Sequence, residues 1–152
     1  MKLNDEIRIT APVGVVYAAL NDPIVLKACI PGCQDLVRHS ESELEATVVL
    51  KIGPMKVRFS GQVILDNSAA PHRFSIAGTG SGGIAGFAKG GAGVTLEADG
   101  PGSILRYQAT AEIGGKMAQL GSRLVQSTAS KLSAQFFARF VQIVESGTGP
   151  VA

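Results

Sequence analysis

Two cysteines are the residues whose spacing comes closest to a metal site. Cys29 and Cys33 flank Ile30-Pro31-Gly32, a separation that resembles half of a zinc or redox motif. The only histidines, His39 and His72, do not form a second pair of ligands. Small buried thiols are therefore the preferred interpretation, and the sequence predicts neither a metal nor another cofactor.

A glycine-dense segment, from Gly78 to Gly93, contains the pattern G-x-G-x-x-G at Gly78, Gly80 and Gly83. That pattern binds a pyrophosphate only where a strand leads into a helix whose first amides face the phosphates. The further glycines of the segment disfavour such a helix, so a dinucleotide site is not predicted. Two interpretations remain open: an internal cavity where side chains are missing from neighbouring strands, or bulges and bends in a curled sheet. The apolar composition favours the cavity.

Catalytic motifs are not evident. The sequence contains no G-x-S-x-G elbow and no H-E-x-x-H pair. Lys116 follows two glycines, but Met117 stands where a phosphate-binding loop has serine or threonine. Tyr107, Arg106 and Asp99 are the acid–base groups available to an enzyme, although no pair of them has the spacing that such chemistry needs.

Composition narrows the class of protein. The chain has 152 residues, a formal charge of +2, 45% hydrophobic residues and only 17% charged residues. Without a dense run of Lys and Arg, nucleic acid is not a predicted partner. The absence of a signal-peptide core or an 18-residue apolar run predicts a cytoplasmic protein. We expect one domain over residues 1–147 and a frayed tail over 148–152.

The elements that must position any site follow from residue periodicity. Alternation predicts a strand over residues 3–9, and two short helices follow over 12–20 and 23–30, the second capped by Asp22. Period-two patterns then predict a long hairpin, residues 44–52 and 55–65, around Gly53-Pro54. Further strands are predicted over 74–78, 94–98 and 105–113.

The last long segment, residues 117–145, is the strongest helix candidate. Its large apolar side chains recur at multiples of four: Leu120, Leu124, Leu132, Phe136, Phe140 and Val144. A sheet with one apolar face needs a covering layer, and this stripe has the right length. We therefore predict an α+β fold in which an antiparallel sheet of about six or seven strands curls around the terminal helix.

Several short motifs spread over nearly the whole chain match one known family. They are Ala11-Pro12, Val15-Val16-Tyr17, Asn21-Asp22-Pro23, Cys29-Ile30-Pro31-Gly32-Cys33, the glycine-rich segment, Leu105-Arg106-Tyr107, Ile113-Gly114-Gly115-Lys116 and Leu120-Gly121-Ser122-Arg123-Leu124. Through them the chain resembles the helix-grip proteins of the START-like (SRPBCC) superfamily, and within it the CoxG family, the G subunit of carbon monoxide dehydrogenase.

The resemblance implies a pocket for an apolar ligand between the sheet and the helix. It also implies a non-catalytic accessory protein that helps to recruit a molybdenum hydroxylase to the inner face of the membrane and, in some members, binds an isoprenoid quinone. The hydroxylase need not oxidise carbon monoxide. Some members carry a C-terminal hydrophobic anchor, which residues 149–152 do not resemble, so direct anchoring of that kind is not expected.

Three functions follow as hypotheses. The first is a carrier of a quinone or lipid, whose expected lining residues are Val57, Phe59, Phe74, Ile76, Phe87, Tyr107, Leu124, Leu132 and Phe136. Truncation of Phe136 is then expected to weaken binding more than it destabilises the fold. The alternatives are a small cyclase or hydrolase of the same fold and a purely protein-binding module. Lys51, Lys56 and Arg58 are expected either to contact a membrane or an acidic partner, or simply to be solvated.

Overall fold

The computed structural model describes residues 1–146 of the chain. A seven-stranded antiparallel sheet has the order β1-β7-β6-β5-β4-β3-β2, so that the first strand, β1 (Lys2–Ile9), pairs with the last. The remaining strands form a meander. They are β2 (Cys33–Arg38), β3 (Glu43–Ile52), β4 (Met55–Asp66), β5 (Arg73–Ser81), β6 (Phe87–Asp99) and β7 (Gly102–Gly114).

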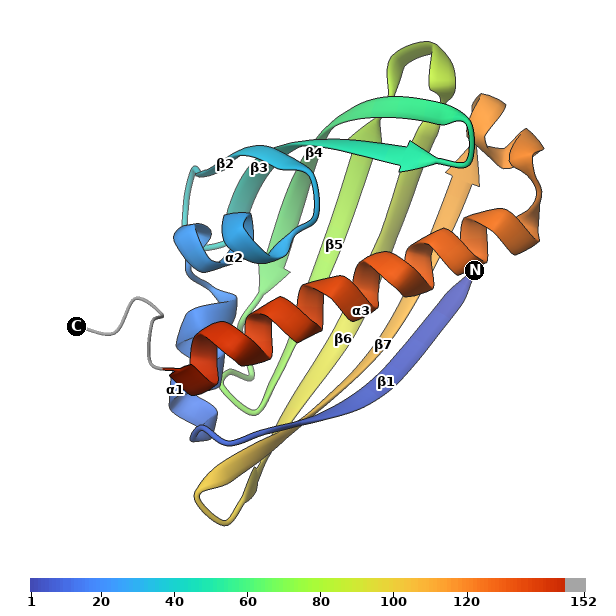
Figure 1. Cartoon of the computed structure of the whole chain (residues 1–152). Coiled ribbons are helices and arrows are strands. Elements are labelled where there is room, and N and C mark those ends of the chain that lie inside the picture. Colours follow the sequence, from blue (N-terminus) through green and yellow to red (C-terminus); the bar gives the residue numbers. More distant parts are fainter. Residues whose placement is uncertain (147–152) are drawn as a thin grey trace.

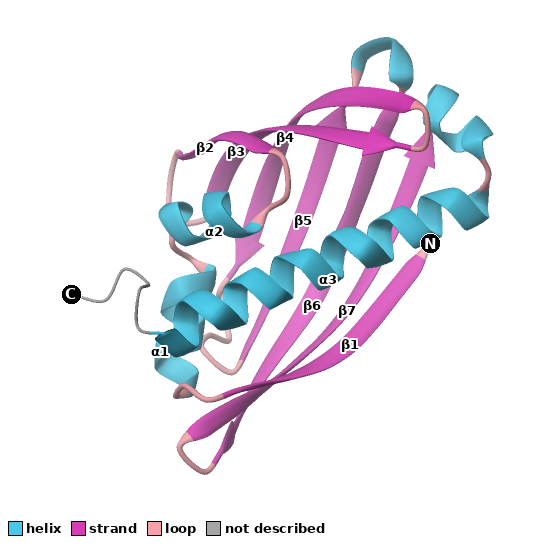
Figure 2. Cartoon of the chain, viewed as in Figure 1, coloured by secondary structure: helices cyan, strands magenta, loops and turns pink. Residues whose placement is uncertain are grey.

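One long helix, α3 (Ser122–Ser146), crosses the concave face of this sheet (Figure 1). Two short helices, α1 (Val13–Leu20) and α2 (Pro23–Cys29), lie at the end of the sheet where α3 finishes (Figure 2). The predicted fold class is therefore confirmed, including the two short helices after the first strand. Two short 3-10 segments, η1 (Gly83–Ala85) and η2 (Gly115–Leu120), lie at the opposite end.

Local sequence explains the short helices. Asp22 caps α2, because its Oδ1 accepts hydrogen bonds from the backbone N–H groups of Ile24 at 2.8 Å and Val25 at 3.4 Å. Pro23 follows as the first helical residue, where its missing N–H has no helical partner to lose. The expected cap and first residue of this helix are both confirmed.

The prediction for the start of the long helix was wrong by five residues. Residues 115–120 form the η2 turn, and α3 begins only at Ser122. Gly121, between them, has a φ of +98°, a conformation that side chains disfavour and that ends the first turn. Met117 and Leu120, both within the predicted helix, instead pack under the turns at this end.

β2 was not singled out by the sequence analysis. It is a short edge strand, and its pairing with β3 shifts register between Cys33 and Asp35. By contrast, β5 and β6 pair without interruption from Arg73↔Thr95 to Ser81↔Phe87. The glycines of β5 and β6, on either side of the η1 turn, therefore lie within continuous strands, and bulges do not account for them.

The apolar interior is divided into two clusters of unequal size. The larger, which we call the main core, lies under α1, α2 and the C-terminal half of α3, and includes Ile9, Val16, Phe74, Leu105, Tyr107 and Phe140. The smaller, which we call the turn cluster, consists of Ile52, Val57, Ala85 and Met117 under the hairpin tip, η1 and η2. The candidate site lies between them.

Candidate functional site

A cavity of about 510 Å³ lies between the sheet and the N-terminal half of α3. Its helical wall is one face of α3, formed by Val125, Thr128, Ala129 and Leu132. Its opposite wall is formed by inward-facing residues of β3 to β7, which are small or aliphatic apart from Phe59. They include Ala46, Val48, Val63, Gly78, Ala88 and Ile113. This volume lies within the range of pockets that hold drug-sized molecules.

The cavity exists because two glycines leave open space. A Cβ placed on Gly78 would lie 3.5 Å from its nearest neighbour, the carbonyl oxygen of Gln62, and one on Gly80 would lie 3.7 Å from the Phe59 ring. Both are ordinary van der Waals separations. The backbone therefore tolerates a side chain at either position, and what the glycines supply is volume.

Two other glycines on the same face have a different role. A Cβ on Gly61 would lie 2.5 Å from the carbonyl oxygen of Thr79, and one on Gly90 would lie 2.2 Å from that of Thr110. Each side chain would collide with the backbone of the neighbouring strand. Gly61 and Gly90 are therefore required by the close approach of strands in the curled sheet, while Gly78 and Gly80 leave space.

Only two of the nine expected lining residues, Phe59 and Leu132, belong to the cavity wall. Val57 is buried in the turn cluster, and Phe87 is 47% exposed, with its ring against Gly114. Leu124 lies over the hairpin turn, where its Cδ2 would be 2.8 Å from a Cβ on Gly53.

The other four expected residues pack in the main core. Phe74 and Tyr107 are buried there, and Ile76 and Phe136 pack against them. Phe136 has its ring 6.0 Å from that of Phe140 and 5.0 Å from that of Phe137, measured between centroids. The nine expected residues are large apolar side chains, which fill space. Small wall residues such as Ala46, Ala88 and Ala129 were not predicted, and their signal is small size at inward-facing positions.

The acid–base candidates do not converge on the cavity. The Tyr107 hydroxyl is 2.5 Å from Ser133 Oγ, within the packed half of the molecule. Arg106 is on the outer face, where bonds to Glu97 and then Glu6 raise its pKa. Asp99 is paired with Arg8 at 3.1 Å. Within residues 1–146, no cluster of three or more His, Cys, Asp or Glu has the arrangement of a metal site.

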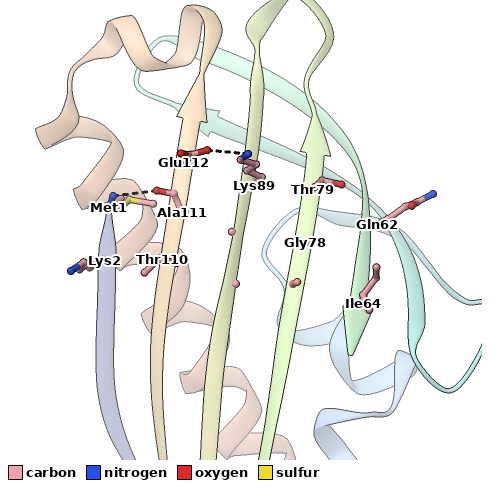
Figure 3. Close-up of a pocket in the computed structure, with 13 residues that line it drawn as sticks. Met1, Lys2, Gln62, Ile64, Gly78, Thr79, Lys89, Thr110, Ala111 and Glu112 are labelled. Atoms are coloured by element: carbon pink, nitrogen blue, oxygen red, sulfur yellow. Dashed lines mark hydrogen bonds and ion pairs between the residues drawn. The ribbon is translucent and has the colours of Figure 1, made fainter. Parts of the chain in front are cut away.

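A second hollow, of about 620 Å³, lies on the outer face of the same part of the sheet (Figure 3). Its wall contains the polar residues Gln62, Thr79 and Thr110 beside the ion pair of Lys89 and Glu112 at 3.3 Å, together with apolar residues such as Ile64. These residues alternate along their strands with the glycines and alanines of the inner cavity, so their side chains point away from it.

Basic side chains gather at the hairpin tip, the end that the turn cluster closes. Lys51 and Lys56 are directly opposite each other across β3 and β4, and Arg58 follows on the same outer face. All three are exposed, and none has an ion pair with another described residue. The η1 turn at this end carries Ile84, which is 88% exposed.

Residues 6–144 match the model of one protein family, the G subunit of carbon monoxide dehydrogenase (CoxG). The chain belongs to this family. The family's name associates CoxG proteins with carbon monoxide dehydrogenase, and the resemblance stated from the sequence is thus confirmed. A search of curated proteins found no match.

Solved structures share the fold of this CoxG family member. A conserved protein from Geobacillus kaustophilus is 26% identical, with 95% of each chain covered and a TM-score of 0.87. Ara h 8.0201 is 20% identical, with 96% of this chain and 98% of that chain covered and a TM-score of 0.64. An aromatase/cyclase from Streptomyces sp. R1128 is 11% identical, with 99% and 96% covered and a TM-score of 0.67. The similarity to Ara h 8.0201 and to the aromatase/cyclase shows that the chain has the helix-grip fold, and nothing more.

None of the helices in residues 1–146 combines the length and the apolarity that crossing a bilayer requires.

Proposed function

We propose that this chain is a non-catalytic carrier that binds an apolar molecule, a quinone or a lipid, between α3 and the sheet. The single observation that carries the proposal is the cavity of about 510 Å³ that remains open at Gly78 and Gly80, where the backbone would tolerate side chains. An unfilled volume of this size removes contacts that would otherwise stabilise the fold. Occupation by a ligand restores those contacts.

The proposal is tested by filling the cavity from the sheet side. Gly78→Val adds a branched side chain that projects towards α3, and we expect it to reduce uptake of the fluorescent apolar probe N-phenyl-1-naphthylamine at least tenfold. Gly93→Val is the matched control, because a Cβ on Gly93 meets no heavy atom within 4 Å and points to the outer face. Equal uptake by both variants and the unmodified chain would contradict binding in this cavity.

The natural ligand is identified by mass spectrometry of an organic extract from the purified protein. We expect an isoprenoid quinone or a lipid in the unmodified chain and in Gly93→Val, and a strongly reduced amount in Gly78→Val. An extract without any such molecule, from protein that also takes up no probe, would contradict the carrier function.

Family membership supports a molybdenum hydroxylase as the protein partner, with the chain acting as its accessory protein. Co-purification of the hydroxylase with the unmodified chain is the expected result. Co-purification that persists in Gly78→Val, together with empty extracts from every variant, would favour a purely protein-binding module over a carrier.

The hairpin tip is our candidate for contact with the membrane. Directly opposed like charges, as at Lys51 and Lys56, destabilise a strand pair, and an anionic surface would offset that repulsion. We expect binding to vesicles containing anionic lipid, lost at high salt and in the double variant Lys51→Glu/Lys56→Glu. Lys27→Glu/Lys131→Glu, on α2 and α3, is the charge-matched control. Equal binding by both double variants would contradict a specific role for the tip.

A further inference from the structure

The cavity wall is apolar with one exception on its helical side. Gln62, Thr79, Lys89 and Thr110 border the cavity through their backbone, but their side chains belong to the outer hollow, as Figure 3 shows. Among the described lining residues, Thr128 alone carries a polar side chain on the face of the cavity itself. It lies on α3 between Val125 and Leu132, beside the small Ala129.

The hydroxyl of Thr128 is available to a ligand although it already makes a hydrogen bond. Its Oγ1 donates to the carbonyl oxygen of Leu124 at 2.8 Å. That carbonyl also accepts from Ser127 Oγ at 3.1 Å, and in an α-helix it accepts the N–H of the residue four positions later. The carbonyl therefore keeps its partners if the Thr128 proton turns away, and the hydroxyl oxygen has lone pairs that accept as well.

We propose that Thr128 is the polar anchor of the cavity, and that the molecule bound there is an apolar compound carrying a carbonyl or hydroxyl oxygen that faces the middle of α3. The inference rests on the proposed carrier function and specifies the class of its ligand. An oxygen elsewhere on the wall would be desolvated without a partner, which disfavours binding. Against Thr128 it accepts a hydrogen bond, or donates one if it is a hydroxyl. The anchor thus selects oxygen-bearing molecules over pure hydrocarbons and sets their orientation.

The test uses two probes of nearly equal shape, 2-acetylnaphthalene and 2-isopropylnaphthalene, titrated into delipidated protein by calorimetry. Thr128→Val replaces the hydroxyl by a methyl group of similar size. We expect it to weaken binding of 2-acetylnaphthalene about five- to tenfold, the typical worth of one hydrogen bond, and to leave 2-isopropylnaphthalene unchanged or slightly tighter. Thr128→Ser should restore the affinity for the ketone.

Thr110→Val is the matched control, because Thr110 borders the same cavity but its hydroxyl faces the outer hollow. It should change neither affinity. If Thr128→Val weakens both probes equally, Thr128 only packs against the ligand and the inference is overturned while the carrier function stands. Unchanged affinity for the ketone overturns it in the same way. If the unmodified chain binds neither probe, the carrier function fails and the inference with it.

Discussion

The two halves of α3 face the same sheet but have different surroundings. Its C-terminal half buries Phe140, Ile143 and Val144 in the main core, where aromatic rings fill the space above β5 to β7. Its N-terminal half faces glycine and alanine across an open cavity. The difference teaches that one continuous apolar stripe can serve two purposes. Residue size on the opposing strands decides whether a given turn of the helix packs against protein or against a ligand.

Each half makes a hydrogen bond to β1 or to the residue that follows it. Near the packed end, the backbone N–H of Thr10 donates to Glu145 Oε2 at 2.8 Å. Near the end that lines the cavity, Gln126 Nε2 donates to the carbonyl oxygen of Lys2 at 3.1 Å. These two bonds connect α3 to the first strand region at both the packed end and the cavity end.

The largest expected effect is at Phe140. Phe140→Ala, at a fully buried position, should lower the free energy of unfolding by about 3–5 kcal/mol, measured by urea denaturation. Leu132→Ala, on the same helix but facing the cavity, should cost only about 1 kcal/mol, because that side chain lines open space and its removal leaves fewer protein contacts unmade. Equal losses at the two positions would remove the distinction between the halves.

The structure changes the expected effect of Phe136→Ala from weaker ligand binding to lower stability. Phe136 packs on Phe137 and Phe140 and is absent from the cavity wall. We therefore expect a loss of about 2–3 kcal/mol in stability, with probe affinity changed less than threefold. If the variant lost probe affinity without losing stability, Phe136 would contact the ligand and the assignment to the main core would be wrong.

The next effect separates glycines that the sheet requires from glycines that leave space. Gly61→Ala should destabilise the fold by about 1–3 kcal/mol, because its Cβ would lie 2.5 Å from the backbone oxygen of Thr79. Gly78→Ala should be neutral or stabilise by up to about 1 kcal/mol, since an alanine has less freedom to lose on folding. Thermal unfolding of the two variants measures the difference, and a reversed order would contradict the division.

The smallest effect is a pH dependence in the packed half. Burial raises the pKa of the Cys29 thiol, and the nearby charge of Arg139 opposes this only partly. The folded state therefore holds this proton at a pH where the unfolded chain has lost it, so stability falls as pH rises above about 8.5. The slope contributed is at most about 1.4 kcal/mol per pH unit.

Urea denaturation from pH 7 to pH 10 measures this slope. Cys29→Ala should lose less stability over that range than the unmodified chain, because the groups that titrate in both proteins cancel in the comparison. Parallel curves for the two proteins would show that the Cys29 thiol does not contribute.

Much of this architecture follows from the sequence because it depends on short-range patterns. Alternation over β3 and β4, the Asp22-Pro23 cap of α2 and the stripe of α3 each involve residues within one element, so periodicity predicts them. The glycines of β5 and β6 likewise indicated a cavity before any strand pairing was known. Their number did not reveal which of them leave space.

Only the tertiary structure shows which glycines leave space and which residues form the wall of the cavity. A Cβ on Gly61 would collide with the backbone of Thr79, whereas a Cβ on Gly78 would have room. This difference depends on the pairing and curvature of β4 and β5, which no local sequence pattern contains. The same holds for Phe136 and Leu132, four residues apart on one stripe, which face different neighbours across the sheet. The sequence by itself determined that there is an apolar interior beneath a long helix. The packing of distant strands determined which part of that interior remains empty.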